Sequence, residues 1–80
     1  MTSEERDRTI RSTLSAVLGV RPADITDETS PDNVGSWDSV THLNLVLALE
    51  EAFGVSFTPE ETMDLTSVRL IHLLLAEKGT

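Results

Sequence analysis

The residues best suited to chemistry lie close together in the chain, at Asp38, Ser39 and His42. These are the residue types of a catalytic triad, in which an acid orients a base and the base activates a nucleophile. The triad requires His42 to reach Ser39. Helical spacing after Ser39 instead places His42 on the apolar face, whereas Ser39 lies at the exposed end of the helix. We therefore expect no catalytic residues in this chain and do not expect it to be an enzyme.

A second kind of chemistry at Ser39 is covalent modification of its hydroxyl. Residues 41–53 contain no Gly or Pro and stop at Gly54, which predicts a helix with Ser39 in its first turn. The first N–H groups of a helix lack intrahelical partners and its dipole is positive there, which favours an anion on the serine oxygen. Serine and aspartate are also common capping residues, so a purely structural role for Ser39 and Asp38 stays open at this point.

The sequence around Ser39 resembles the phosphopantetheine attachment helix of acyl carrier proteins. The resemblance begins at Asp38-Ser39-Val40, where the family usually has Asp-Ser-Leu, and it extends over nearly all 80 residues. Trp37 departs from the small or aliphatic residue often found before the Asp-Ser pair, and we expect it to pack the end of a loop against the protein. The downstream positions that match are Leu43, Leu45, Val46, Ala48, Leu49, Glu50, Glu51, Phe53 and Gly54.

The resemblance implies a function for Ser39. In carrier proteins, the serine at this place receives a 4′-phosphopantetheine arm from coenzyme A, transferred by a separate magnesium-dependent phosphopantetheinyl transferase. The thiol of the arm carries acyl intermediates as thioesters between acyl-loading and acyl-transferring enzymes. Asp38 would help to position the metal or the basic groups of the transferase. The chain has no cysteine, so any thiol that it uses must come from an added group.

The helix after Ser39 has two distinct faces. A turn of 100° per residue places the core on one face, with Leu43 at its edge. Apolar residues beside acids on the opposite face suggest a docking surface. Single exposed apolar residues are normal, but the resemblance favours docking, because carrier proteins present this helix to their enzymes. The expected core residues are His42, Leu45, Val46, Leu49 and Phe53, and the expected partner-binding residues are Val40, Asn44, Leu47, Glu50 and Glu51.

The chain is strongly acidic, with a net charge of -8 and a pI near 4.4. Residues 22–68 hold ten Asp or Glu and no Lys or Arg, so this half favours basic partners and repels nucleic acid. No apolar run has the length of a signal peptide or approaches the roughly 20 residues of a membrane span. We expect a monomeric, cytoplasmic protein that has no membrane or nucleic-acid partner and forms one domain over residues 1–80.

Helical patterns dominate the rest of the chain. Residues 3–18 carry an apolar stripe, residues 59–64 form a short helix, and a final helix runs from a cap at Thr66 or Ser67 to Gly79. The final helix is apolar nearly all round, so we expect much of it to be buried. Three long helices and one short helix predict an all-α fold, a small four-helix bundle of the kind that the resemblance implies.

The connections are predicted to be irregular. Residues 20–37 are rich in turn-forming types and predict a long first loop, which Ile25 and Val34 tie to the core. An EF-hand does not fit this loop, because the required glycine and glutamate are missing. Residues 55–57 alternate like a strand, but nothing else in the chain would pair with them, so we expect an extended connection.

We expect no metal ligands in this chain. His42 and His72 are interpreted as packed side chains, because two histidines without a supporting carboxylate cluster make no recognisable site. The arginines of residues 3–18 are interpreted as a solvated face, with Asp7 and Arg11 forming an i,i+4 pair.

The residues around Ser39 indicate the type of carrier. Residues 37–39 and 41–45 are similar to freestanding carriers of specialised pathways, such as polyketide assembly, more than to the general fatty-acid carrier, where acids are usual at Thr41 and Asn44. The start at Met1 and the end just after the last helix also suggest a freestanding protein. Two alternatives stay open: a peptidyl or aminoacyl carrier, and an acidic helical adaptor that is never modified.

Overall fold

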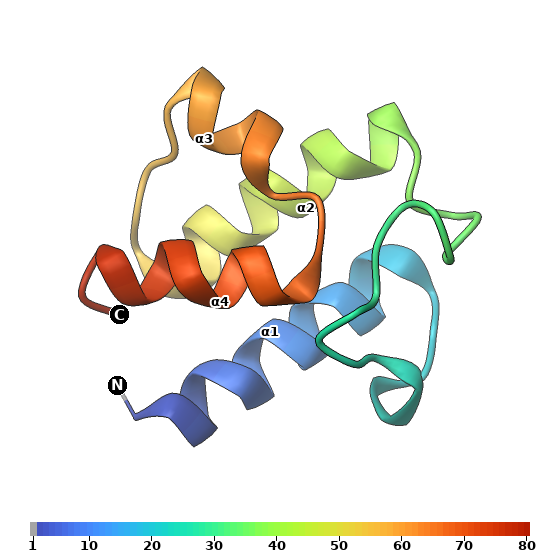
Figure 1. The fold of residues 1–80 in the computed structure, drawn as a ribbon, viewed down its shortest axis with the longest axis horizontal. Helices are drawn as coiled ribbons and strands as arrows, with labels where there is room; N and C mark the ends of the chain where they lie inside the picture. The colour runs from blue at the N-terminus through green and yellow to red at the C-terminus, as the bar shows by residue number, and fades with distance from the viewer. Residues whose placement is uncertain (1) are drawn as a thin grey trace.

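The computed structural model describes residues 2–80 and is built from helices throughout. In Figure 1 the short α3 lies near the start of α2, and the start of α1 lies on the same side of the molecule as the end of α4. No strand occurs in residues 2–80, and residues 55–57 are an extended connection, as predicted. The all-α four-helix fold is confirmed, with elements α1 (Ser3–Leu18), the 3₁₀ helix η1 (Pro22–Asp24), α2 (Ser39–Phe53), α3 (Pro59–Asp64) and α4 (Val68–Glu77).

Local signals in the sequence set the ends of the two longest helices. The Thr2 side chain accepts a hydrogen bond from the backbone N–H of Glu5, which satisfies one free donor at the start of α1. Gly19 and Gly54 follow α1 and α2 with φ values of 71° and 65°, a left-handed conformation that glycine adopts without a steric penalty. The bounds predicted for these two helices are therefore confirmed.

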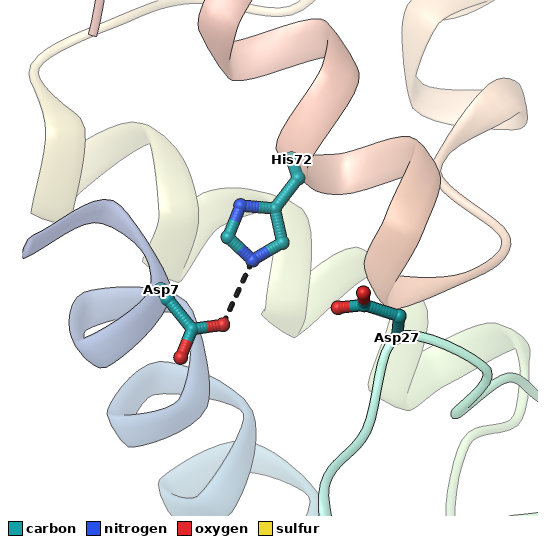
Figure 2. Close-up of side chains that lie close together, drawn as sticks. All are labelled: Asp7, Asp27 and His72. Atoms are coloured by element: carbon teal, nitrogen blue, oxygen red, sulfur yellow. Dashed lines mark hydrogen bonds and ion pairs between the residues drawn. The ribbon is translucent and has the colours of Figure 1, made fainter. Parts of the chain in front are cut away.

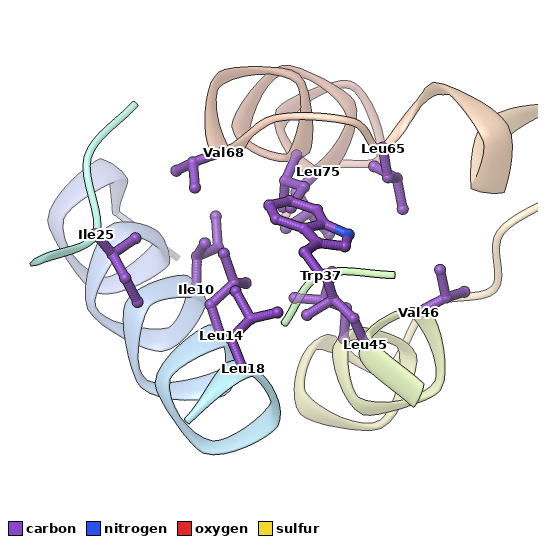
Figure 3. Packing of buried hydrophobic residues seen from close by; sticks show 12 residues of the cluster. Ile10, Leu14, Leu18, Ile25, Trp37, Leu45, Val46, Leu65, Val68 and Leu75 are labelled. Carbon is purple, nitrogen blue, oxygen red and sulfur yellow. The ribbon is translucent and has the colours of Figure 1, made fainter. Parts of the chain in front are cut away.

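The core lies between α1, α2 and α4. Side chains from all three helices are fully buried, and the predicted loop residue Ile25 joins them, while Val34 packs against the cluster. Trp37 is only 3% exposed and lies among the aliphatic side chains in Figure 3, as predicted for the end of the loop. The fully buried aliphatic residues are Ile10, Leu14, Ile25, Leu45, Leu49, Leu65, Val68, Ile71 and Leu75.

The first loop is more ordered than the sequence indicated. It contains η1, and its carbonyl groups meet the start of α4: the N–H of Val68 donates to Thr29 O at 3.0 Å, and the N–H of Arg69 donates to Asp27 O at 3.1 Å. Thr29 is buried, and its Oγ1 accepts a hydrogen bond from Thr26 N. The loop therefore satisfies donors of α4 that have no partner within the helix.

Two burial predictions hold only in part. The sequence predicts that much of α4 is buried, which is true of Val68, Ile71 and Leu75, but Leu70 is 40% exposed and Leu73 is 56% exposed. Leu43 of α2, predicted at the edge of the core face, is 60% exposed. The reason is geometric, because only one face of each of these helices reaches the core.

Within residues 2–80, none of the helices combines the length and the apolar character that a membrane crossing requires.

The predicted pair of Asp7 and Arg11 is present, at 2.7 Å, but it belongs to a larger network. Asp7 Oδ1 also lies 3.0 Å from His72 Nε2 on α4, and Arg11 donates to the backbone oxygen of Ile25. Arg6 Nε donates to Thr80 O at 2.7 Å. The interpretation of these arginines as a merely solvated face is therefore wrong for Arg6 and Arg11, which tie α1 to other parts of the chain.

The network also shifts the ionisation of Asp7. Burial alone would raise the pKa of this carboxyl, but hydrogen bonds from Arg11 and His72 outweigh burial, and the net pKa lies below its usual value. A folded-state pKa below the unfolded value of about 3.9 means that the stabilisation is complete above that pH. The stabilisation is lost as the pH falls through the folded-state pKa.

Replacing Asp7 by Asn should therefore destabilise the protein near neutral pH and have little effect in strong acid. The Asp7 side chain is 37% exposed. Because solvent screens its charge, we expect a loss of at most about 1 kcal/mol near neutral pH. Urea unfolding at neutral and acid pH measures this. Asp32→Asn, which removes the same charge from an exposed loop residue, is the control, and an equal effect of both variants at neutral pH would contradict the assignment.

Candidate functional site

Ser39 is the first residue of α2, and its neighbour Asp38 caps the helix. Asp38 Oδ1 accepts a hydrogen bond from Thr41 N at 2.9 Å, so the capping role belongs to Asp38. The Ser39 side chain is exposed, and no hydrogen bond engages its hydroxyl within residues 2–80. The helix therefore does not need the Ser39 hydroxyl for capping, which leaves that hydroxyl free for chemistry.

The surroundings of Asp38 stabilise the ionised form of its carboxyl group. The backbone N–H of Thr41, which donates to this carboxylate, lowers the pKa of Asp38 below its usual value. The backbone N–H groups of Ser39 and Val40 belong to the first turn and have no partner within the helix. The N–H of Val40 also interacts with the Asp38 carboxylate. The start of α2 thus offers the backbone N–H of Ser39 and the positive end of a helix dipole beside the Ser39 hydroxyl.

Ser39 borders an open groove of about 420 Å³ between the start of α2 and the end of α3. We call it the Ser39 groove. Residues of the first loop, of α2 and its cap, of α3 and of the segment after α3 contribute to it. Its lining residues are Pro31, Trp37, Asp38, Ser39, His42, Met63 and Thr66.

A relay of hydrogen bonds connects the two walls of this groove. The Nε1–H of Trp37 donates to His42 Nδ1 at 3.0 Å, and His42 Nε2 lies 2.8 Å from Thr62 O on α3. Because Nδ1 accepts, the proton is assigned to Nε2, which donates to the carbonyl oxygen. The two rings are also stacked, with centroids 6.2 Å apart. Both ring nitrogens of His42 are therefore engaged away from Ser39, which agrees with the expectation that the two residues do not act as base and nucleophile.

Side chains of other helices hold α3 in place. This helix has only six residues, and a capping box at its start pairs Thr58 with Glu61. Lys78 Nζ lies 2.9 Å from Glu61 Oε1, and it also lies 5.5 Å from the centre of the Phe57 ring. Together with the hydrogen bond from His42 to Thr62, these contacts hold in place a helix that is too short to be stable by itself.

The outward face of α2 is exposed as predicted. Val40 and Leu47 are 70% and 63% exposed, and Asn44 and Glu51 are exposed beside them. Glu50 differs, because it is half-buried and its Oε2 accepts a hydrogen bond from Phe57 N at 2.8 Å.

Two further apolar residues extend this exposed surface. Leu43 is 60% exposed and Met63, on α3, is 76% exposed. Neither residue was among the expected partner-binding positions. The packing of α3 beside α2 places Met63 in the Ser39 groove, and helical spacing within α2 carries no signal of that packing.

His72 has carboxylate neighbours that the sequence did not indicate. Figure 2 shows Asp27 pointing toward His72, while Asp7 is joined to His72 by a hydrogen bond. One potential ligand atom from each of the three residues lies within 4.8 Å of the others, so the premise that no carboxylates surround this histidine is wrong. Within this cluster Asp7 belongs to an ion-pair network, because both of its oxygens are already engaged, and Arg11 and Arg69 line the same cavity.

Replacing His42 by Ala should destabilise the folded protein, because it removes the hydrogen bonds that His42 makes with Trp37 and Thr62. The change leaves the buried Trp37 N–H without its acceptor, and we expect a loss of about 1–3 kcal/mol in the free energy of unfolding. Urea unfolding followed by circular dichroism measures the loss. A double-mutant cycle with Trp37→Phe isolates the pair, and a coupling energy near zero would show that the relay contributes nothing.

A comparison with known families shows which family this chain belongs to. Residues 8–71 match the family model described as the phosphopantetheine attachment site. The match runs from α1 into α4 and includes every residue that lines the Ser39 groove. Domains of this family bear covalently attached 4′-phosphopantetheine, interact with phosphopantetheinyl transferases and acyl-handling enzymes, and are generally not catalytic. This chain belongs to the family of phosphopantetheine-binding carrier proteins.

Proposed function

We propose that Ser39 is the residue of this chain that bears the 4′-phosphopantetheine. The observation that carries the proposal is the exposed Ser39 hydroxyl, which has no hydrogen bond within residues 2–80 because Asp38 caps the helix. The residues around it fit a phosphodiester. The backbone N–H of Ser39 and the positive end of the α2 dipole would stabilise its negative charge.

Three other serines in the family match have hydrogen bonds that support helix ends, whereas Ser12, inside α1, and Ser56, in the connection after α2, have none within residues 2–80 but do not begin a helix. Ser15 Oγ donates to Val20 O, and Ser36 Oγ donates to Leu18 O. Ser67 Oγ accepts from Leu70 N as the cap of α4. Modifying any of these oxygens would cost a contact that holds a helix end. Modifying Ser39 costs none.

The proposed role is that of an acyl carrier in polyketide assembly or a related pathway. The thiol supplied by the bound group holds acyl intermediates as thioesters, and the chain presents them to successive enzymes. The similarity of residues 37–39 and 41–45 to carriers of specialised pathways supports this choice of pathway. A peptidyl or aminoacyl carrier is the alternative, because the loading enzyme rather than the carrier selects the cargo.

The proposed docking face is the exposed side of α2. Val40 and Leu47 would bury apolar area against a partner, and Glu51 would meet a basic group. Asp38 would additionally face the metal or the basic groups of the transferase, as its position beside Ser39 allows. The net charge of -8 would steer basic partner surfaces toward this side of the chain.

Incubation with coenzyme A, magnesium and a broad-specificity phosphopantetheinyl transferase should add the mass of one phosphopantetheinyl group. Ser39→Ala should abolish the gain. Ser3→Ala is a matched control, because Ser3 is also the first residue of a helix whose capping residue precedes it. Intact-mass spectrometry measures the outcome. A gain that persists in Ser39→Ala would refute the proposed attachment residue, and no gain in the folded wild-type protein would favour the unmodified adaptor.

Replacing Leu47 or Glu51 by Lys should impair recognition by partner enzymes without changing the fold. Both side chains are exposed, so helicity measured by circular dichroism should stay unchanged. The KM of the transferase for the carrier should rise by about tenfold, equivalent to about 1.4 kcal/mol of lost binding. Glu4→Lys makes the same charge change as Glu51→Lys, at an exposed position of α1, and it should raise the KM less. Equal KM values for all variants would argue against this docking face.

A further inference from the structure

Three side chains from separate parts of the chain bring metal-ligand atoms together beside α4. Asp7 belongs to α1, Asp27 to the first loop and His72 to α4. One nitrogen or carboxylate oxygen from each residue lies within 4.8 Å of the others. Figure 2 shows the Asp27 carboxylate pointing toward the His72 ring, while Asp7 meets the same ring from α1. We call these three residues the His72 cluster.

Contacts within the fold hold the members of the His72 cluster in place. The backbone N–H of Arg69 donates to Asp27 O at 3.1 Å, so this loop residue is held against the start of the helix that carries His72. Arg11 Nε donates to Asp7 Oδ2 at 2.7 Å and orients that carboxylate. The other oxygen, Asp7 Oδ1, lies 3.0 Å from His72 Nε2. The fold itself therefore brings the three side chains together.

The ligand types and their spacing suit zinc. Zinc binds imidazole nitrogen and carboxylate oxygen at about 2.0–2.2 Å in tetrahedral geometry, which places neighbouring ligand atoms about 3.4 Å apart. The 3.0 Å between His72 Nε2 and Asp7 Oδ1 is close to that separation, so a small movement of the side chains admits the ion. In the complex, the neutral imidazole keeps its proton on Nδ1 and presents the Nε2 lone pair to the metal. Two bonds to zinc then replace the hydrogen bond between His72 and Asp7.

The surroundings of the cluster allow an ion to enter. An open cavity of about 760 Å³ is lined by all three residues. Asp27 is exposed, and within residues 2–80 its carboxylate takes part in no ion pair or hydrogen bond, whereas the His72 side chain is only 19% exposed. An exposed carboxylate thus faces a half-buried imidazole, with room on the cavity side for water as a fourth ligand.

Arginines around the cavity restrict which metal fits. Arg6, Arg8, Arg11 and Arg69 line it, and Arg11 already balances the charge of Asp7. Magnesium and calcium are held by oxygen ligands, and their binding here would depend on negative charge that these arginines offset. Zinc also gains a bond to the imidazole nitrogen, a ligand that the harder cations do not favour. The histidine therefore decides the choice of metal.

We infer that Asp7, Asp27 and His72 bind a zinc ion that joins α1, the first loop and α4. None of the three residues lines the Ser39 groove, so the site is separate from the proposed attachment. An ion that binds the folded chain and not the unfolded chain stabilises the fold by mass action. The sequence predicted no metal ligands, because the three residues lie far apart in the chain and only packing brings them together.

The test uses the tag-free, unmodified chain after treatment with a chelator, with zinc chloride as the probe. Isothermal titration calorimetry should show one zinc ion bound per chain, and zinc should raise the thermal midpoint of unfolding. NMR detection of the histidine ring nitrogens should show a large shift of His72 Nε2. The His42 ring should not respond, because Trp37 and Thr62 already engage both of its nitrogens. Magnesium chloride at the same concentration should leave the His72 ring signals unchanged.

Variants of the cluster show whether it holds the ion. His72→Gln keeps an amide donor for Asp7 but removes the imidazole lone pair, and Asp27→Asn removes the charge of an exposed side chain. Each should weaken zinc binding by at least about tenfold and remove the zinc-dependent rise of the unfolding midpoint. Asp32→Asn is the matched control, because it makes the same charge change as Asp27→Asn at another exposed position of the first loop. It should bind zinc as the wild type does.

Three results would overturn the inference. The first is a wild-type protein that binds no zinc at millimolar concentration. The second is equal zinc affinity of His72→Gln and the wild type, which would show that zinc is attracted to acidic residues elsewhere in the chain. The third is an equal response to magnesium that is lost in Asp27→Asn and kept in His72→Gln, which would show a carboxylate site without the histidine. None of these results bears on the attachment at Ser39, because the chain tested is unmodified.

Discussion

The hydrogen bond from the buried indole of Trp37 to His42 organises the functional end of this molecule. Burying an N–H group without an acceptor costs free energy. The loop that carries Trp37 must therefore place this N–H beside an acceptor in the folded protein. His42 supplies that acceptor from α2, and its other nitrogen faces Thr62 O on α3. One imidazole thus links the loop, the helix that begins at Ser39 and the short helix opposite. The shape of the Ser39 groove depends on this link.

Small size makes such links important. A chain of 80 residues buries only about 60% of the surface that its unfolded form exposes, so its core alone provides limited stability. The chain compensates at its helix ends, where carbonyl groups of the loop satisfy donors at the start of α4 and Lys78 holds Glu61 of α3. Arg6 joins the start of α1 to Thr80 at the other end of the chain. Short helices are kept in place here by contacts from outside themselves.

The sequence predicted those features that depend on neighbouring residues. Helix bounds follow from local caps and glycines, and so does the position of Ser39 in the first turn of α2, so both could be predicted from the chain. Features that depend on distant residues were missed. The contact of Asp7 with His72 joins positions 65 apart in the sequence. The exposure of Leu70 was missed because an apolar residue does not reveal whether its helix lies inside the bundle or on its surface.

The basic residues of the chain show how its charge is distributed for recognition. Arg11, Arg21 and Lys78 are paired with carboxylates, and Arg6 is bound to the backbone of Thr80. The positive charges of Arg11, Arg21 and Lys78 are therefore balanced by neighbouring carboxylates within the molecule. Acidic residues on α2 such as Glu51 are exposed and contribute to the external field. An exposed acidic surface of this kind attracts basic surfaces over distance, which favours a basic partner on the side of the molecule that carries α2.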